Sequence, residues 1–365
     1  MPPPPRILLT GATGYIGGTI LTALLATPTP SFALPITCLI RSPSAAATLT
    51  STYGATRIRP LLYGGLDDHA TATAAAAQHA DIVINAALGY DAGAALALLR
   101  GLAAGRDETI ATEPWYVHLS GTSNLGDRSV SGAWVEAQRV FDDDDARGVH
   151  AWETRVEGLH PYVQRGAEIA VVDEGVALGV RTVVVMPPMV WGRGTGVVGR
   201  RQSTQVPAYV KAARARGRAV VMGDGRGAWD HVHVEDLAGL YGVLVERVAV
   251  GGGEGVPWGR EGIVFAADGR QTWREVAKAV AEVGVEGGWL REGGVDEVSV
   301  EEGTRIFAEV YLGNVDEEMV ELGLASHGKT VPSVARRLGW KPTRGGEEAW
   351  RMGLREDVKA AFETS

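Results

Sequence analysis

A glycine-rich turn close to the N-terminus constrains the fold of this chain more than any other feature. Residues 6–11 form a short apolar run ending in glycine, and residues 14–26 carry apolar side chains at helical spacing, so the turn joins a predicted strand to a predicted helix. In such a turn Gly11 permits the tight bend, Gly14 lets the backbone approach a pyrophosphate, and Gly17 allows close packing of helix on strand. The N–H groups and the dipole at the helix start favour a bound anion. Dinucleotide contacts are therefore expected from Gly11, Thr13, Gly14, Tyr15, Ile16 and Gly17.

Strand-like and helix-like segments alternate through the first half of the chain. Residues 35–41, 81–88 and 115–121 are short apolar runs, and residues 71–80 and 94–104 between them are rich in alanine and leucine at helical spacing. Alternation of this kind implies right-handed βαβ crossovers and a parallel sheet with helices on both faces. The pattern predicts an α/β fold with a Rossmann-type doubly wound sheet.

The character of the sequence changes after Pro188, where glycine-rich loops separate short helices and strands. At 365 residues the chain is long enough for about two domains. We expect a dinucleotide-binding domain over residues 1–190, to which residues 229–248 also contribute, and a smaller α+β substrate-binding domain over most of residues 191–365.

Composition and charge exclude several classes of protein. Hydrophobic residues make up 45% and charged residues 22%, which is typical of a globular chain, and the formal net charge of −9 argues against nucleic-acid binding. The single cysteine, Cys38, excludes an intramolecular disulfide and a cysteine-based zinc site. No signal-peptide pattern or apolar stretch of about 18 residues is present, so a cytoplasmic protein without a membrane partner is expected.

Neither of two candidate metal clusters predicts a metal site. The acidic run at residues 142–145 is expected to be a solvated loop, because carboxylates adjacent in sequence rarely converge on one ion. His231 and His233 lie two residues apart but lack a third ligand cluster.

The end of the second predicted strand discriminates between the two nicotinamide dinucleotides. It reads CLIRSP, with Arg41 followed by Ser42 and no acidic residue nearby. An acidic side chain there would bind the ribose 2′-hydroxyl of NAD, whereas arginine accommodates the 2′-phosphate of NADP. The sequence therefore favours NADP(H) over NAD(H).

Several motifs, in the same order, resemble the extended short-chain dehydrogenase/reductase superfamily of NAD(P)-dependent epimerases, dehydratases and reductases. TGATGYIGG resembles its first turn, NAAL at residues 85–88 its strand end beside the ribose, and MPPMVWGRG at residues 186–194 its stretch beside the nicotinamide. Residues 230–238 and 336–342 are similar to two further segments of that superfamily. Homodimers are common there, and a homodimer is compatible with this sequence. The resemblance implies further cofactor contacts by Ala86, Ala87, Pro187, Met189 and Val190.

The Tyr-x-x-x-Lys motif that carries catalysis in the superfamily is incomplete. Tyr162 is followed four residues later by Gly166, and a register that aligns Glu168 with the superfamily's later glutamate puts His160 and Gln164 at the two positions. Neither register supplies the lysine that lowers the pKa of the tyrosine. An unassisted phenol, with a pKa near 10, is about 4 kcal/mol from releasing its proton at neutral pH.

Three interpretations of this region follow. Tyr162 exchanges a proton with help from Arg165 or the nicotinamide ribose; or His160, whose ordinary pKa is about 6.5, is the acid and base; or solvent supplies the proton. In HLSGTSNLGD, which is similar to the superfamily's catalytic Ser/Thr segment, Thr122 is the first candidate to hold a substrate oxygen and Ser120 the second. Substrate contacts are expected from Tyr90, Asp91, Trp191, Arg193 and His231.

The leading functional hypothesis is an NADP(H)-dependent oxidoreductase that transfers hydride to or from a small or medium organic carbonyl or alcohol. One alternative is an epimerase, isomerase or dehydratase acting on a sugar nucleotide or natural-product intermediate with bound NAD(P). The other is a non-catalytic NADP-binding sensor or partner protein, which the missing lysine favours. The retained C-terminal part, with aromatic loops at Trp191, Trp229 and Trp258, favours an enzyme with a small-molecule substrate.

Overall fold

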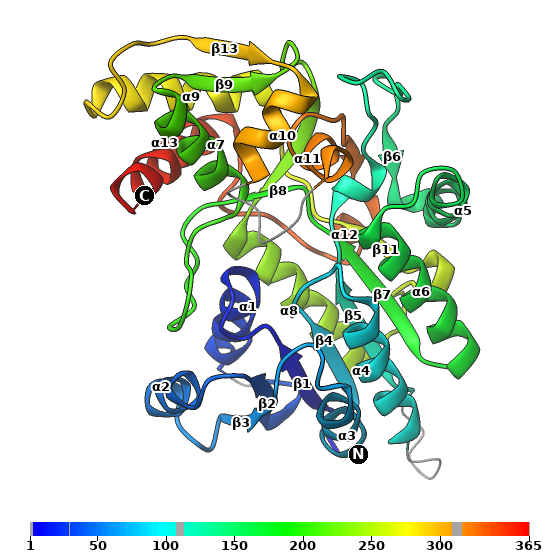
Figure 1. Ribbon diagram of the computed structural model, residues 1–365. Coiled ribbons are helices and arrows are strands. Elements are labelled where there is room, and N and C mark those ends of the chain that lie inside the picture. The colour runs from blue at the N-terminus through cyan, green and yellow to red at the C-terminus, as the bar shows by residue number, and fades with distance from the viewer. Residues whose placement is uncertain (1–2, 29, 107–112, 309–315, 365) are drawn as a thin grey trace.

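The computed structural model describes residues 3–28, 30–106, 113–308 and 316–364. Its larger layer is a parallel sheet of seven strands in the order β11-β7-β5-β4-β1-β2-β3 (Figure 1). The strand order reverses between β1 and β4, and ligands of doubly wound sheets bind at such a point. The strands are β1 (Arg6–Thr10), β2 (Ala33–Ile40), β3 (Ile58–Leu62), β4 (Ile82–Asn85), β5 (Trp115–Leu119), β7 (Arg181–Met186) and β11 (Ile263–Phe265).

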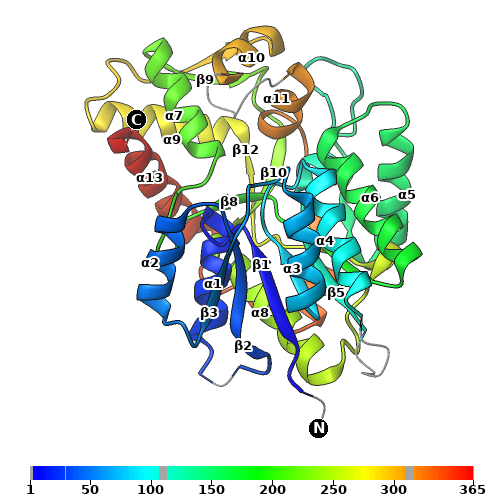
Figure 2. The ribbon, with the colours of Figure 1, turned by 60° about the horizontal axis from the view of Figure 1, so that its bottom comes forward.

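Helices cover both faces of this sheet, as the alternating sequence pattern predicts (Figure 2). On β1, Ile7 and Leu9 face one layer of helices and Leu8 faces the other, because successive side chains of a strand point to opposite faces. The first layer is α1 (Tyr15–Ala26), α2 (Pro43–Tyr53) and α8 (Val234–Gly251). The second layer contains α3 (His69–His79), α4 (Ala92–Ala104) and α6 (Val163–Leu178), with α5 (Ala146–Glu157) packed on α6.

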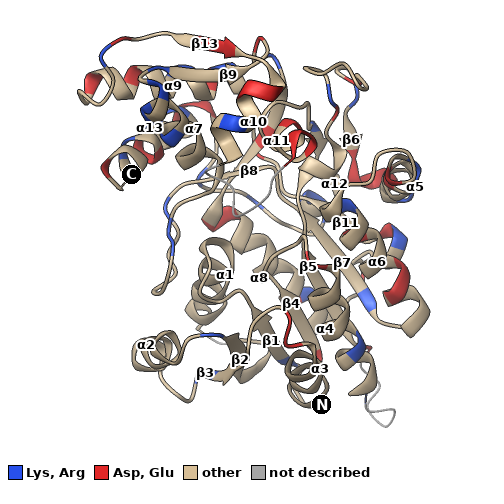
Figure 3. Cartoon of the chain, viewed as in Figure 1, with Lys and Arg blue, Asp and Glu red and all other residues tan. Residues whose placement is uncertain are grey.

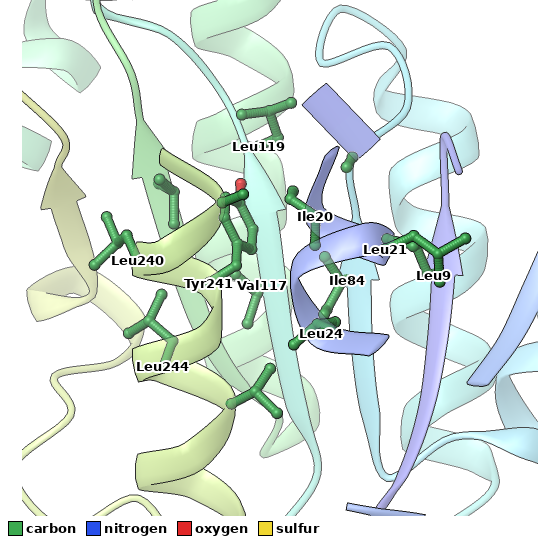
Figure 4. Close-up of a cluster of buried hydrophobic side chains, with 14 of the residues drawn as sticks. Leu9, Ile20, Leu21, Leu24, Ile84, Val117, Leu119, Leu240, Tyr241 and Leu244 are labelled. Atoms are coloured by element: carbon green, nitrogen blue, oxygen red, sulfur yellow. The ribbon is translucent and has the colours of Figure 1, made fainter. Parts of the chain in front are cut away.

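The core between the sheet and the first layer is continuous and apolar (Figure 4). Ile20 and Leu24 of α1 and Leu240 and Leu244 of α8 project toward the sheet strands, and all four side chains are buried. Burial of a side chain of this size contributes about 1.5–3 kcal/mol, so this packing fixes α1, and with it the glycine turn, against the sheet.

A second hydrophobic core lies in the smaller part of the molecule. It is built around a three-stranded sheet and a two-stranded sheet, with helices between and beside them (Figure 1). The strands are β8 (Met189–Trp191), β10 (Ala228–His233) and β12 (Arg270–Thr272), then β9 (Ala219–Met222) and β13 (Val295–Val298). The helices are α7 (Gln205–Arg216), α9 (Trp273–Glu286), α10 (Val300–Ala308), α11 (Glu317–Leu324) and α13 (Glu347–Thr364).

In addition to α8, two segments from the C-terminal half of the chain pack with the seven-stranded sheet. Strand β11 pairs in parallel with β7 and completes the seven-stranded sheet. Helix α12 (Ser333–Arg337) contributes Val334 and Ala335 to the hydrophobic core that also contains α1 and α8. A further two-stranded sheet joins β6 (Phe141–Asp142) to β14 (Thr330–Val331), so distant parts of the chain are tied together beside α5.

The interpretation of the acidic run as a solvated loop is wrong for one of its members. Asp143 is 1% exposed, and its carboxylate accepts hydrogen bonds from the backbone N–H groups of Phe265 at 2.9 Å and Val334 at 2.8 Å. Burial raises the pKa of Asp143 to about 7. The run lies where β6 leads into α5 (Figure 3), and Asp143 anchors β11 and α12 there, a contact that local sequence does not reveal.

Membrane-spanning helices and metal clusters are both absent from the part of the chain that the structure describes. None of the helices in the described ranges has the length and hydropathy needed to cross a membrane. Within the same ranges, no three or more His, Cys, Asp or Glu side chains are grouped so that they could hold a metal ion.

Candidate active site

The glycine turn has a backbone geometry that excludes larger residues. Gly11 has φ of +73°, and a Cβ atom added to it would lie 2.2 Å from the carbonyl oxygen of Ala86. A Cβ atom on Gly17 would lie 2.3 Å from the carbonyl oxygen of Gly11. Gly14 is the N-cap of α1 and no side chain caps this helix, so the N–H groups of its first turn remain for an anion. The turn therefore fits the diphosphate of a dinucleotide.

A loop from the smaller part of the molecule runs along this turn and α1. Within this strap loop, residues 192–201, Gly192 accepts a hydrogen bond from the Tyr15 hydroxyl at 2.6 Å, and the N–H of Thr195 donates to Thr19 Oγ1 at 3.2 Å. A Cβ atom on Gly199 would lie 2.1 Å from the carbonyl oxygen of Thr13, so the loop touches the turn directly. The predicted contact residue Tyr15 thus has its side chain engaged with the strap loop.

Of the expected substrate residues, Trp191 ends β8 and Arg193 belongs to the strap loop. They line a cavity of about 740 Å³ together with His233 and residues of α13 such as Asp357. Trp191 is buried edge-on against His233, with ring centroids 4.6 Å apart, and Arg193 is exposed. Three arginines, Arg193, Arg200 and Arg201, lie in the strap loop, which carries blue segments in Figure 3.

The residues expected to bind the adenosine half lie at the ends of β2 and β4. Arg41 is exposed directly after β2 and packs beside Gly65. Ser42 caps α2 by accepting a hydrogen bond from the N–H of Ala45 at 3.3 Å. Ala86 is buried and Ala87 half-buried after β4, next to the glycine turn.

A polar chain crosses the carboxyl ends of the three central strands. Thr10 Oγ1 donates to Asn85 Oδ1 at 2.7 Å, and Asn85 Nδ2 lies 3.3 Å from His118 Nδ1. Burial lowers the pKa of His118 to about 4, so this ring is neutral at physiological pH. These three side chains therefore add hydrogen-bonding groups, but no charge, at the point between β1 and β4 where the strand order reverses.

Three polar side chains meet at the end of β5, at the place where the superfamily's catalytic hydroxyls are expected. Tyr162 is 4% exposed, and its hydroxyl lies 3.3 Å from Ser123 Oγ. Ser123 Oγ donates to Gln164 Oε1 at 2.6 Å. Gln164 packs against Gly89 and Gly121, so it lies between the ends of β4 and β5. We call Tyr162, Ser123 and Gln164 the hydroxyl cluster.

A buried arginine supplies positive charge next to this cluster. The Cζ atom of Arg165 lies 5.6 Å from the centroid of the Tyr162 ring. Its Nε donates to the carbonyl oxygen of Asn124 at 2.9 Å and its Nη1 to that of His160 at 2.8 Å. Glu157 Oε2 accepts from both Arg165 Nη1, at 3.3 Å, and the N–H of Tyr162, at 3.0 Å. A fixed positive charge at this distance favours the ionised form of a phenol.

The other predicted catalytic residues, His160 for proton transfer and Thr122 and Ser120 for holding a substrate oxygen, have different partners from the hydroxyl cluster. His160 is half-buried and stacks on Trp134, with ring centroids 4.4 Å apart. Thr122 is fully buried, and its N–H donates to the carbonyl oxygen of Pro187 at 3.1 Å. The hydroxyl of Ser120 donates to Glu168 Oε2 at 2.5 Å, so this serine holds α6 rather than facing Tyr162.

The remaining predicted residues have the following positions. Tyr90 lies edge-on to Tyr162 at 6.3 Å between ring centroids, whereas Asp91 caps α4 through the N–H of Ala94 at 2.9 Å. His231 is buried and stacks on Trp350 at 4.1 Å. Met189 and Val190 are buried in β8, where the Met189 sulfur accepts a hydrogen bond from Gln271, and Thr13 and Ile16 are partly exposed in the turn.

Sequence reasoning did not select Ser123 or Gln164 as site residues. One signal was available for each of them. Ser123 belongs to the hydroxyl-rich SGTS segment, and Gln164 occupies the lysine position of the register that aligns Glu168. The structure brings both into contact with Tyr162 or its partner.

Comparison with known proteins identifies the family. The model of the NAD dependent epimerase/dehydratase family matches residues 161–256. The chain is 31% identical over 314 residues to the Acremonium sp. protein named Oxidase ucsJ. This match spans 81% of this chain and 84% of that protein. It is 24% identical over 372 residues to an uncharacterized protein of Saccharomyces cerevisiae, covering 98% of this chain and 99% of that one.

Solved structures with this fold include reductases and dehydratases. Alfalfa vestitone reductase superposes with a TM-score of 0.59 at 14% identity, over 99% of this chain and 98% of the reductase. The dTDP-glucose 4,6-dehydratase DesIV of Streptomyces venezuelae gives 0.62 at 15% identity, over 96% of each chain. Together with the ordered motifs and the seven-stranded sheet, these matches show that the chain belongs to the extended short-chain dehydrogenase/reductase superfamily, in the NAD(P)-dependent epimerase/dehydratase/reductase family.

Proposed function

We propose that this protein is an NADP(H)-dependent oxidoreductase that transfers hydride between nicotinamide C4 and a small or medium organic carbonyl or alcohol. The observation that carries the proposal is the hydroxyl cluster, in which Tyr162 and Ser123 lie 3.3 Å apart at the end of β5. Two hydroxyl groups at this separation can bind one substrate oxygen between them. The Acremonium relative, 31% identical, is named an oxidase, which supports a redox reaction.

Different residues bind the substrate oxygen and transfer the proton. A bound nicotinamide supplies or accepts the hydride. The Ser123 hydroxyl donates to Gln164 Oε1 in this structure, and we expect it to turn and donate to the substrate oxygen when substrate binds. In the direction of reduction, the Tyr162 hydroxyl gives its proton to that oxygen, and the Arg165 charge stabilises the resulting phenolate until solvent returns a proton.

Arg41 supports the choice of NADP(H). Its guanidinium is exposed at the carboxyl end of β2, where the ribose 2′ position of a dinucleotide lies in this fold. A guanidinium can bind a phosphate through two parallel hydrogen bonds, which a ribose hydroxyl cannot match.

The test combines cofactor titration with a turnover assay on a panel of carbonyls and alcohols. We expect NADPH to bind more tightly than NADH, and at least one class of carbonyl to oxidise bound NADPH. Binding of NADPH without turnover of any panel member would instead support the non-catalytic alternative. Exchange of deuterium between cofactor and product without net oxidation of the cofactor would support an epimerase.

A further inference from the structure

Two glutamates are buried against each other behind the segment that carries Ser123. Glu153 comes from α5 and Glu168 from the adjacent α6, and both side chains are 0% exposed. Their carboxyl groups are within hydrogen-bonding reach of each other. The Asn124 side chain also lies within hydrogen-bonding reach of Glu153. Both oxygens of Glu153, Oε1 of Glu168 and Oδ1 of Asn124 are buried acceptors that receive no hydrogen bond. Two carboxylates cannot both stay ionised in such a position without a large free-energy cost.

The hydrogen bonds around the pair indicate which of the two carboxyl groups carries the proton. Glu168 Oε2 accepts from Ser120 Oγ at 2.5 Å and from Asn124 Nδ2 at 2.7 Å, so this oxygen is unprotonated. Oε1 of the same carboxyl receives no hydrogen bond, and Glu153, which contacts this carboxyl group, can supply a donor only if it is protonated. A proton on Glu153 that is donated to Glu168 gives both carboxyl groups a hydrogen bond and removes one of the two like charges.

The charges around the pair balance one negative charge and not two. Arg165, from α6, is the cation that acts on both carboxyl groups. That cation also interacts with Glu157 of α5 and Glu318 of α11, which further reduces its capacity to neutralise the pair. Burial raises the pKa of Glu153 well above its ordinary value and that of Glu168 to about 7.

We propose that Glu153 and Glu168 hold one proton between them, and that this proton fixes the segment of residues 120–124 so that Ser123 faces Tyr162. Ser120 and Asn124, the two donors to Glu168, flank Ser123 in the chain. Loss of the shared proton leaves two like charges in contact, so Glu168 moves away from Glu153 and its bonds to Ser120 and Asn124 are strained. Glu153 is then a positioning residue that acts on the hydroxyl cluster through Glu168.

The first test measures the proton itself and needs no substrate, so it stands whether or not the proposed oxidoreductase activity is found. Infrared difference spectra of wild type minus Glu153→Gln are recorded at about pH 8, in the region of the carboxylic acid C=O stretch. The glutamine can still donate to Glu168 but cannot ionise. We expect a carboxylic acid band in the difference spectrum. Absence of the band overturns the proposal.

Other buried acids do not obscure this measurement. The pKa of Asp143 is raised to about 7 and that of Asp357 to about 6, both by burial. Both acids are present in wild type and variant, so their bands cancel in the difference. Glu174→Gln is the matched control, because Glu174 lies on the same helix as Glu168 but pairs with Arg100 at the surface. This control should give no carboxylic acid band.

The second test separates positioning from a general structural role. It rests on the proposed function and compares the pH profiles of turnover, with a carbonyl from the panel as substrate. We expect wild-type turnover to fall by up to about tenfold per pH unit on the basic side, and Glu153→Gln to retain its rate there. Coincident profiles, with the infrared band present, would show that the pair shares a proton without positioning Ser123 and would overturn the proposal.

Thermal unfolding across pH gives a reading that is independent of catalysis. A folded-state pKa raised above its unfolded value adds stability at low pH that is lost as pH rises through the folded value. The wild-type unfolding midpoint should therefore fall as pH rises from the ordinary pKa of a glutamate toward the raised pKa of Glu153, which lies well above it, and Glu153→Gln should show a smaller fall. Equal falls in the two proteins count against a shared proton.

Discussion

The two halves of the site differ in what the sequence has to specify. At the diphosphate end the backbone makes the site: Gly11, Gly14 and Gly17 act by lacking a side chain. At the hydride end the chemistry depends on which side-chain atoms meet. There Tyr162 contacts Ser123, which in turn donates to Gln164, and neither contact involves a lysine. A backbone site leaves a spacing pattern in the sequence, whereas a cluster of side chains from separate elements does not.

The largest expected effect is at the diphosphate end. Gly11→Ala places a Cβ atom 2.2 Å from the carbonyl oxygen of Ala86 at a residue with φ of +73°, so the turn has to move. We expect NADPH binding to be lost in calorimetric titration. The matched control is Gly239→Ala in α8, where an added Cβ atom meets nothing within 4 Å. This control should bind NADPH normally and raise the unfolding free energy by about 0.5–1 kcal/mol.

The next largest effect is expected at the hydride end of the site. Tyr162→Phe removes the hydroxyl that lies 3.3 Å from Ser123 Oγ and leaves the ring in place. Removal of a general acid reduces turnover by about 10²–10⁴-fold, while NADPH affinity should stay unchanged. His160→Asn is the comparison variant, because this ring stacks on Trp134 and not on the cluster. If His160→Asn has the larger effect on the rate, proton transfer belongs to the histidine.

The fold and the glycine turn were predictable because local patterns determine them. The strand–turn–helix order and the βαβ alternation are repeated over short ranges, and both are confirmed by the seven-stranded sheet. The hydroxyl cluster was not predictable from helical spacing, because Tyr162 is the N-cap of α6 with extended backbone angles, φ −131° and ψ 122°. Its i+4 neighbour Gly166 therefore says nothing about what its hydroxyl contacts. Asp143 likewise accepts hydrogen bonds from Phe265 and Val334, which follow it in the sequence by 122 and 191 positions.

Arg41 tests whether any side chain at the cofactor end carries specificity. Arg41→Ala removes a charged partner for a 2′-phosphate but leaves the turn intact. We expect NADPH to bind about 10–100-fold more weakly, equivalent to roughly 1.4–2.8 kcal/mol, and NADH affinity to stay the same. Fluorescence titration with both cofactors measures the ratio. Equal weakening of both cofactors would assign Arg41 to a general structural role, and no change for either would remove the basis for NADP(H) preference.

The smallest effect is expected where a cofactor-end side chain has a structural partner. The Tyr15 hydroxyl donates to the carbonyl oxygen of Gly192 at 2.6 Å, and burial raises the pKa of this phenol well above its ordinary value. Tyr15→Phe removes one buried hydrogen bond and should lower the unfolding free energy by about 1–3 kcal/mol. NADPH affinity should change little, because the N–H groups of the turn are unaltered. A large loss of affinity in a variant that stays folded would show that the strap loop, held by Tyr15, forms part of the cofactor site. Side chains as well as backbone would then determine binding at this end of the molecule.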